Sequence, residues 1–395
     1  MENRTKRILR AVSVILITAF IFCGCAKAKE EDPPLVVKDL AVIHETEFGG
    51  VYIVITIDDF NALGFEYGDS VDVAFSSGYT LEDIPYYNGY YVDAGSPLLV
   101  AYSGYDYIKA AVNYGDDLWD TAMLMASPRP DLFVTAGLEE HSTAEITLRE
   151  KGKYLDIQKI SDIHYTDIRE EYPSDEAFAN FRQVTVGDIK EGVLYRSASP
   201  CDDQHKRAAY TDRLISAAGV ACILDLADNE MKIERYIASE GFDCPYFLSL
   251  YENGAVIPIA LSMNFTSEDF GASLAEGLKE MSSKDGPYLV HCTEGKDRTG
   301  FVCMVLEALA GASWQEIVDD YMLTYANYYK ITPQKDPEKY ELILERNLVA
   351  MMKFVIGDPG ADPATADLSQ AARRYLTVAG MTDEQVDLLL RRLTE

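Results

Sequence analysis

Basic residues are scarce in this chain of 395 residues. Its 35 lysines and arginines stand against 65 aspartates and glutamates, which gives a formal net charge of -30 at pH 7. Such an acidic surface repels nucleic acid and anionic lipid in general, so we expect no nucleic-acid partner. An anionic ligand must instead be drawn in by a local positive site.

Patterns typical of disulfide frameworks and metal sites are also lacking. Two of the seven cysteines, Cys23 and Cys25, lie in the N-terminal segment, and no CxxC pair occurs among the rest. An odd number of cysteines at wide spacing predicts free thiols. The remaining five are Cys201, Cys222, Cys244, Cys292 and Cys303. The histidines outside residues 291–300 are scattered singly, and we expect neither a metal nor a cofactor.

The apolar run near the N-terminus is shorter than the roughly 20 residues that a membrane-spanning helix needs. Four basic residues precede the run "AVSVILITAFIFCGC", and "AKAKEEDPP" follows it. A basic region, an apolar region and a small-residue exit are typical of an export signal. We therefore assign residues 1–25 to an export signal and expect residues 1–24 to be cleaved from the mature protein.

The end of this run, Phe22-Cys23-Gly24-Cys25, resembles the lipobox of bacterial lipoproteins. The resemblance implies that Cys25 receives the lipid, although Phe22 departs from the usual aliphatic residue. It places the protein on the extracytoplasmic face of the bacterial cell membrane, held by a lipid anchor. An uncleaved anchor and a buried hairpin or helix are the alternatives.

A linker at 26–37 and a β-rich domain at 38–158 are predicted next. Short alternating or apolar runs such as "GGVYIVITI" and "DSVDVAFSSG", separated by turn residues, indicate strands as far as "AEITLREKGKYLDIQ". The tyrosines of this domain suit strand packing or a glycan- or peptide-binding face. "ITIDDFNALGFEYGDSVDVAF" loosely resembles the β-barrel C-terminal domain of S-adenosylmethionine hydroxide adenosyltransferases. That resemblance implies a barrel-like fold, and no adenosyl chemistry, because their catalytic domain is missing here.

Residues 159–395 alternate strand and helix patterns, which predicts an α/β domain with a central, mostly parallel sheet flanked by helices. "GVLYRS", "ACILDL" and "PYLVH" are the strand candidates. Thr266 with Asp269 predicts one helix start, and Ser313 with Glu316 and Thr382 with Gln385 predict two more. The apolar spacing within 313–329 favours a packed helix over a lid.

The segment "HCTEGKDRTG", residues 291–300, joins a predicted strand to a predicted helix. Such a junction points successive backbone N–H groups into one concavity, and the helix N-terminus adds partial positive charge. We expect a dianion to bind there, held by the loop residues Thr293, Glu294, Gly295, Lys296, Asp297 and Arg298. Gly295 lets the loop bend tightly.

A cysteine at the base of such a loop is stabilised as the thiolate, which makes Cys292 the candidate nucleophile. Arg298 presents a planar fork to two phosphoryl oxygens. Attack of Cys292 on phosphorus would form a phosphocysteine, which water then hydrolyses. Thr299 is expected to donate its hydroxyl to the leaving thiolate, and His291 to order the loop from behind.

These residues resemble the signature of the protein tyrosine phosphatase superfamily, HCxxGxxR followed by Ser or Thr. "GKDRTG" resembles, more narrowly, the bacterial tyrosine and phosphoinositide phosphatases. Upstream, "NFR" at 180–182, "LYRSASP" at 194–200 and "LDLADNE" at 224–230 are similar to further elements of that group. The resemblance covers about residues 176–330. Gln183, Val184 and Ala227 depart from the family pattern, which bears on upstream substrate contacts.

The general acid has two candidates. Tyrosine-specific relatives use an aspartate in a Trp-Pro-Asp loop, but neither Trp119 nor Trp314 is followed by Pro-Asp. Asp297, beside Arg298, and Asp225, in "LDLADNE", remain equally open. Lys296 is either a second cation for a multiply phosphorylated head group or a solvated side chain.

The sequence thus predicts an exported phosphatase with a cysteine nucleophile, acting on phosphotyrosyl protein or on phosphoinositides. One alternative is a phytase-like inositol polyphosphate phosphatase. The other is a surface-binding lipoprotein whose β domain engages glycan or peptide without catalysis.

Overall fold

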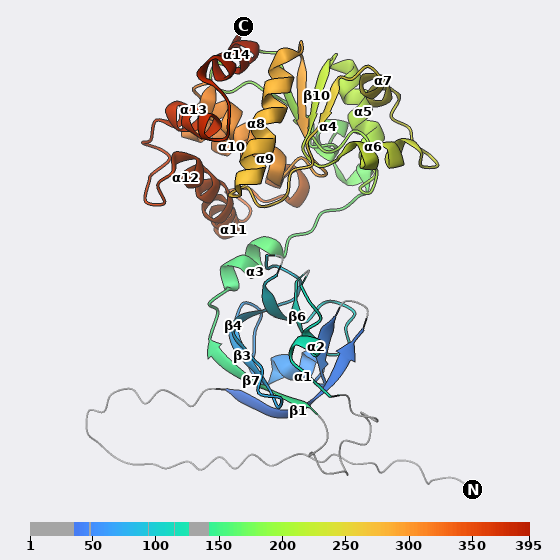
Figure 1. Ribbon diagram of the computed structural model, residues 1–395, viewed down its shortest axis with the longest axis vertical. Coiled ribbons are helices and arrows are strands. Elements are labelled where there is room, and N and C mark those ends of the chain that lie inside the picture. Colours follow the sequence, from blue (N-terminus) through green and yellow to red (C-terminus); the bar gives the residue numbers. More distant parts are fainter. Residues whose placement is uncertain (1–34, 47–48, 94, 114, 126–141) are drawn as a thin grey trace.

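The computed structural model describes residues 35–46, 49–93, 95–113, 115–125 and 142–395. A β barrel and an α/β domain follow one another along the long axis, with helix α3 (Leu155–Ser161) between them (Figure 1). The predicted signal segment and Cys25 lie outside the described residues. Within those residues, no helix combines the length and the apolar character needed to cross a bilayer.

The N-terminal region holds a closed seven-stranded barrel in the order β1-β2-β6-β5-β4-β3-β7. Its neighbours are antiparallel except for β4 and β5. This agrees with the predicted barrel-like domain, and β1 begins two residues inside the predicted linker. The strands are β1 Val36–Glu45, β2 Gly50–Ile53, β3 Ser70–Phe75, β4 Thr80–Tyr87, β5 Pro97–Val100, β6 Ile108–Val112 and β7 Thr143–Glu150.

Helices occur at two places where the sequence indicated strand. Helix α1 (Ile57–Ala62) begins inside the predicted strand region because the Thr56 side chain accepts a hydrogen bond from the Asp59 N–H. Helix α3 replaces the end of the last predicted strand. There the Gln158 side chain is buried and donates to Asn88 Oδ1 of the barrel at 2.6 Å, so tertiary contacts decide the conformation. A third short helix, α2 (Leu118–Thr121), covers β2 and β6.

The tyrosines of the barrel are used mainly for packing. Tyr86 and Tyr87 are fully buried. Tyr90 and Tyr105 lie over the buried ammonium group of Lys109, which also pairs with Glu45. This arrangement favours the packing interpretation of the tyrosines over a ligand-binding face.

The second domain is built on a five-stranded sheet in the order β11-β10-β12-β9-β8. All neighbours are parallel except β8 and β9, which matches the mostly parallel sheet predicted. The strands are β8 Arg182–Val184, β9 Leu194–Ser197, β10 Cys222–Asp225, β11 Val256–Pro258 and β12 Tyr288–His291.

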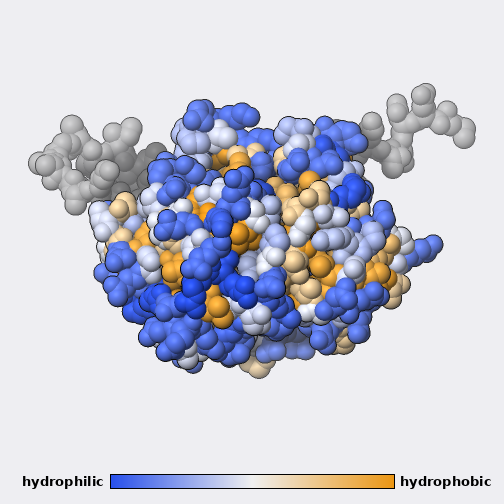
Figure 2. Space-filling model, turned by 90° about the horizontal axis from the view of Figure 1, so that it is seen from above, coloured by the Kyte–Doolittle hydropathy of each residue, from blue (hydrophilic) through white to orange (hydrophobic). Residues whose placement is uncertain are grey.

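Helices cover both faces of this sheet (Figure 1). One apolar cluster packs α8, α9, α10, α13 and α14 against it, and another packs α5 and α7. The elements are η3 Arg169–Glu171, α4 Asp175–Phe178, α5 Ala208–Ala217, α6 Glu230–Ile237, α7 Pro245–Glu252, α8 Glu268–Ser283, α9 Asp297–Leu309, α10 Trp314–Tyr329, α11 Pro337–Ile343, the π-helix η4 Leu344–Val349, α12 Ala350–Ile356, α13 Leu368–Val378 and α14 Asp383–Thr394. On the face in Figure 2, hydrophilic side chains predominate with apolar ones between them.

Two of the three predicted helix starts are confirmed. Ser313 and Thr382 both form complete capping boxes, at α10 and α14. The prediction at Thr266 was wrong by one residue, because Ser267 caps α8 and accepts from the Phe270 N–H. Helix α10 is a packed helix, with Tyr321 and Tyr325 buried, as its apolar spacing predicted.

Candidate active site

The segment 291–300 forms a tight loop between the carboxyl end of β12 and the start of α9. Cys292 follows the strand directly, is 3% exposed and is a free thiol. Gly295 has φ +68°, and a Cβ added there would lie 2.3 Å from the Ser197 carbonyl oxygen. Only glycine therefore allows the loop to pass this close to the neighbouring strand β9.

The carbonyl groups of the loop are held from outside. Asn180 Nδ2 and Arg196 Nη2 donate to the Gly295 oxygen at 3.1 and 3.0 Å. Tyr328 Oη donates to the Glu294 oxygen at 3.0 Å. The N–H groups of residues 293–296 have no acceptor within the described part of the chain. With the carbonyls turned outward, these N–H groups remain free to bind an anion.

A buried ion-pair network holds these supporting side chains. Arg182 Nε donates to Asp320 Oδ1 at 2.7 Å, and Arg196 pairs with the other oxygen of the same carboxylate. Burial alone would raise the pKa of Asp320, but Arg182 and Arg196 outweigh it and hold that pKa well below its usual value. The NFR and LYRS elements thus support the loop from behind in this structure.

Arg298 lies in the first turn of α9 and reaches across to other loops. Its Nη1 donates to the Leu261 carbonyl at 3.2 Å, and its Nη2 donates to Thr293 Oγ1 at 3.4 Å. Its Nε atom is buried and has no partner within the described residues. The guanidinium is thus oriented by carbonyl oxygens while retaining donor capacity for a bound anion.

His291 and Thr299 flank the loop in the buried layer. The His291 ring is fully buried, and burial lowers its pKa to about 4, so the imidazole is neutral. Its Nδ1 lies 3.4 Å from the Cys292 carbonyl oxygen, in keeping with the predicted role behind the loop. The Thr299 hydroxyl is buried without a partner in the described chain, so the expected hydrogen bond to Cys292 is not formed here.

The two candidate acids lie in different surroundings. Asp225 is fully buried, and its Oδ1 accepts the N–H groups of Ala227 and Asp228 at 2.9 and 3.1 Å. Burial raises the pKa of Asp225 to about 6. Asp297 is 35% exposed and lines a cavity beside the loop. Solvent exposure therefore distinguishes Asp297 from Asp225, which the sequence had left as equal candidates for the general acid.

Asp225, Asp228 and the Cys201 thiol form the grouping most suited to a metal among the described residues, with ligand atoms within 4.8 Å of one another. The sequence implied no metal. The Asp225 carboxylate already accepts two backbone N–H groups, and Asp228 accepts from Tyr236 Oη at 3.3 Å. One oxygen of each carboxylate, Asp225 Oδ2 and Asp228 Oδ2, is nonetheless buried without a hydrogen-bond partner among the described residues.

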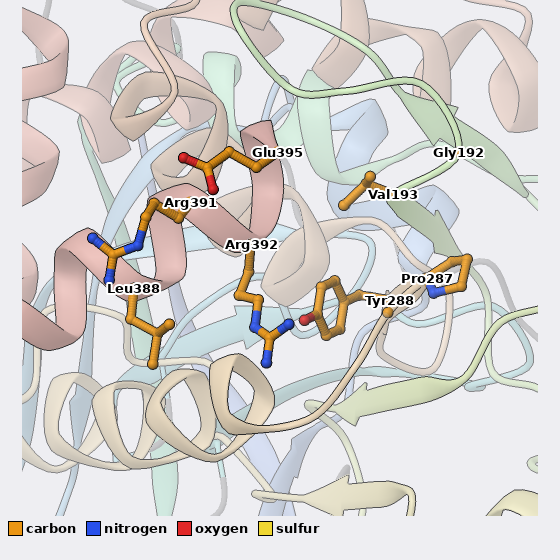
Figure 3. Close-up of a pocket in the computed structure, with 9 residues that line it drawn as sticks. Gly192, Val193, Pro287, Tyr288, Leu388, Arg391, Arg392 and Glu395 are labelled. Atoms are coloured by element: carbon orange, nitrogen blue, oxygen red, sulfur yellow. The ribbon is translucent and has the colours of Figure 1, made fainter.

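Two pockets of similar size lie at opposite ends of the sheet. One, of about 370 Å³, borders the loop of residues 291–300 at Glu294, Lys296 and Asp297. The other, of about 420 Å³, lies at the amino ends of β9 and β12, where Arg392 approaches Tyr288 (Figure 3). Ligands of parallel α/β sheets bind beyond the carboxyl ends of the strands, which favours the first pocket.

Several side chains that hold the loop were not assigned a role from the sequence. Tyr165 Oη donates to Glu294 Oε1 at 2.8 Å, and Asp320 and Tyr328 belong to α10, far along the chain. No local motif identifies them, because their roles depend on long-range packing. Asn180, Arg182 and Arg196 had a signal, as parts of the family-like NFR and LYRS elements.

The family model described as "Tyrosine phosphatase family" matches residues 176–395. This is more than half of the chain, and the chain belongs to this family. The match confirms the predicted resemblance and extends it from about residue 330 to the C-terminus. The resemblance of the β domain to adenosyltransferases stays a prediction.

One curated relative and two solved structures complete the comparison. A tyrosine-protein phosphatase of Nostoc commune is 41% identical over 58 residues, which is 15% of this chain and 19% of the relative. The chain thus matches about a fifth of that relative's length. The core catalytic domain of the PP-IP phosphatase SIW14 from S. cerevisiae in complex with citrate is 19% identical, covering 42% of this chain and 91% of that one, with a TM-score of 0.26. P. aeruginosa TpbA is 15% identical, covering 60% and 99%, with a TM-score of 0.23.

Proposed function

We propose that this protein hydrolyses phosphomonoesters, phosphotyrosyl protein in particular, through a phosphocysteine intermediate. The observation that carries the proposal is the loop of residues 292–298. The Glu294 and Gly295 carbonyl groups are bonded outward, the N–H groups of residues 293–296 have no acceptor among the described residues, and Cys292 and Arg298 stand at its two ends. Family membership supports the same reaction class.

In the first step, the Cys292 thiolate attacks phosphorus and forms the S–P bond while the P–O bond to the leaving group breaks. The loop N–H groups and Arg298 hold the three non-bridging oxygens through the transition state. The leaving oxygen takes a proton from an acid. In the second step, water attacks phosphorus, the S–P bond breaks, and the same carboxylate accepts the proton of the water.

Asp297 is the acid that the geometry favours. It borders the cavity beside the loop and is partly exposed, whereas Asp225 is fully buried and bonded to two backbone N–H groups. The raised pKa of Asp225 would suit an acid, but a proton donor must first reach the leaving oxygen. We therefore assign Asp225 to holding the 225–228 turn beneath Arg298.

The charge balance of the loop favours a substrate with one phosphoryl group. Lys296 is within 4.0 Å of two carboxylates, those of Glu294 and Asp297, so it brings no spare positive charge. A phytase-like or phosphoinositide substrate would need further cations around the mouth. Phosphoinositides remain the second candidate class because a lysine stands in the loop, as in the multi-specific phosphatases that the loop resembles.

The N-terminal segment carries a separate proposal. A lipid on Cys25 would tether the enzyme to the extracytoplasmic face of the cell membrane. Cys25→Ala is expected to move the protein from the membrane fraction to the soluble fraction, and unchanged fractionation would contradict the anchor.

The first experiment measures phosphate release by the full chain from a phosphotyrosyl peptide, a phosphoseryl peptide, a phosphoinositide and inositol hexakisphosphate. Cys292→Ser should reduce release at least about a thousandfold. Cys244→Ser, at another buried free thiol, is the matched control and should retain activity. Absence of release from every substrate by the folded, reduced protein would favour the non-catalytic surface-binding alternative.

A further inference from the structure

The cavity beside the catalytic loop is built partly by the segment that joins the two domains. Its volume is about 370 Å³. Asp297, Lys296 and Glu294 form one side, and Tyr325, Tyr329 and Asn347 form another. The remaining wall is Ile160, Ser161, Ile163 and Tyr165, at the end of α3 and in the segment that follows it, which we call the interdomain linker. These four residues precede the region that the family model matches, which begins at 176.

The linker wall is held firmly against the loop. Tyr165 Oη donates to Glu294 Oε1 at 2.8 Å, and the Tyr165 ring lies 5.1 Å from the ring of Tyr328. The Arg207 guanidinium carbon lies 4.8 Å from the Tyr165 ring centroid. The linker therefore contributes a fixed surface next to the residues that bind the phosphoryl group.

Helix α3 is attached to the same side of the domain. Asp156 accepts from Arg346 Nη2 at 2.7 Å, and Lys159 pairs with Glu338. Both partners belong to the helical segment α11–η4, which also supplies Asn347 to the cavity. These ion pairs, outside the cavity, thus join the wall formed by the end of α3 to the wall that carries Asn347.

The charged residues that line the cavity sum to a formal net charge of -1. Glu294 and Asp297 each contribute a carboxylate, and Lys296 contributes an ammonium group. Lys296 Nζ lies 3.8 and 3.6 Å from those two carboxylates and 5.5 Å from the Tyr329 ring centroid. Burial alone would lower the pKa of Lys296, but Asp297 outweighs it with help from Glu294, so the ammonium stays charged. A second phosphate would be repelled here, and a cation would be attracted.

We propose that this cavity, the linker subsite, binds a lysine or arginine side chain next to the phosphotyrosine of a peptide substrate. The proposal rests on the proposed function and specifies its substrate. A long basic side chain brings one positive charge to a net negative, mainly polar cavity, and the amide of Asn347 offers it an acceptor. The acidic surface of the whole chain, with its net charge of -30, attracts the same class of peptide.

The test compares three phosphotyrosyl peptides that differ only in having Lys, Ala or Glu beside the phosphotyrosine, with para-nitrophenyl phosphate as a substrate without flanks. The full chain is expected to show a kcat/KM about tenfold higher for the Lys peptide than for the Glu peptide. Ser161→Lys places an ammonium on the linker wall, outside the catalytic loop. It should remove most of that preference while para-nitrophenyl phosphate turnover stays within about twofold. Ser161→Ala is the matched control and should keep the preference.

The possible failures are distinguishable. Equal kcat/KM for the Lys and Glu peptides, or a preference that survives Ser161→Lys in the folded protein, overturns the linker subsite. Absence of para-nitrophenyl phosphate hydrolysis by the wild-type chain overturns the proposed function instead. In that case the Lys and Glu peptides are compared by calorimetric binding, where tighter binding of the Lys peptide supports the subsite and equal binding overturns it.

Discussion

Lys296 and Arg298 stand two residues apart in the catalytic loop and have different surroundings. Lys296 is matched by the carboxylates of Glu294 and Asp297, whereas Arg298 contacts carbonyl and hydroxyl oxygens and keeps a buried Nε without a partner in the described chain. Among the described residues, Arg298 is therefore the cation of this loop that has no carboxylate within 4.0 Å. A planar, bidentate donor is required there, which lysine does not provide.

Asp297→Asn tests the general acid. We expect the rate of alkyl phosphate hydrolysis to fall by about two to four orders of magnitude and that of aryl phosphates to fall less, because an aryl leaving group needs the proton less. Steady-state kinetics on one ester of each kind measures the difference. Asp225→Asn, at a fully buried carboxylate, should reduce both rates equally. A larger alkyl than aryl loss in Asp225→Asn alone would reverse the assignment.

Asp228 makes the stability depend on pH. Burial, reinforced by Asp225, raises the pKa of Asp228 to about 6, above the ordinary value of 3.8. Between pH 4 and 6 the folded protein holds a proton that the unfolded chain has released, so stability falls as pH rises through this window. Asp228→Asn should raise the free energy of unfolding at pH 7.5 by about 2 to 3 kcal/mol and have little effect at pH 4. Denaturant unfolding at both pH values measures this, and an equal effect at both would contradict it.

At the scale of elements, the junction between β12 and α9 depends on one close approach to β9. Gly295 and Gly254 have nearly the same left-handed backbone, with φ +68° and +67°. A Cβ at Gly295 would meet the Ser197 backbone at 2.3 Å, whereas a Cβ at Gly254 would meet nothing within 4 Å. Alanine substitutions at these two glycines therefore separate two free-energy costs. Both variants place alanine in a left-handed conformation, and only the one at Gly295 also displaces the loop.

Gly295→Ala is expected to lower kcat/KM by at least about a hundredfold, since a displacement on the order of 1 Å is enough to misplace the reacting groups. Gly254→Ala should lose about 1 kcal/mol of stability and keep its activity. Phosphate release and thermal unfolding of both variants measure these effects. Similar activities for the two variants would show that the contact with Ser197 does not position the loop.

For the whole molecule, the net charge of -30 makes association depend on salt. Raising the ionic strength from 0.01 to 0.15 M shortens the Debye length from about 30 to about 8 Å. We expect kcat/KM for a basic phosphotyrosyl peptide to fall about three- to tenfold over this range, because attraction is screened. For the dianion para-nitrophenyl phosphate it should rise slightly, because repulsion is screened. The same direction for both substrates would contradict electrostatic steering.

Much of the fold could be predicted, and the failures were local. The barrel-like domain, the mostly parallel sheet and the capping boxes at Ser313 and Thr382 follow from short-range patterns. Helix α3 could not be predicted, because it forms where Gln158 meets Asn88 of the barrel, 70 residues earlier in the chain. The donation expected of Thr299 to the leaving thiolate stays a prediction, since its hydroxyl is buried without a partner among the described residues.

The sequence by itself determined the reactive groups, because a strand, a short loop and the first turn of a helix place Cys292, Gly295 and Arg298 by local geometry alone. Only the tertiary structure decided what surrounds them. Asn180 and Arg196 bond to the Gly295 carbonyl from 115 and 99 residues away, and Tyr165 reaches Glu294 across 129. Such contacts depend on how the sheet, α10 and the linker pack together, and no periodicity or spacing in the sequence encodes that arrangement.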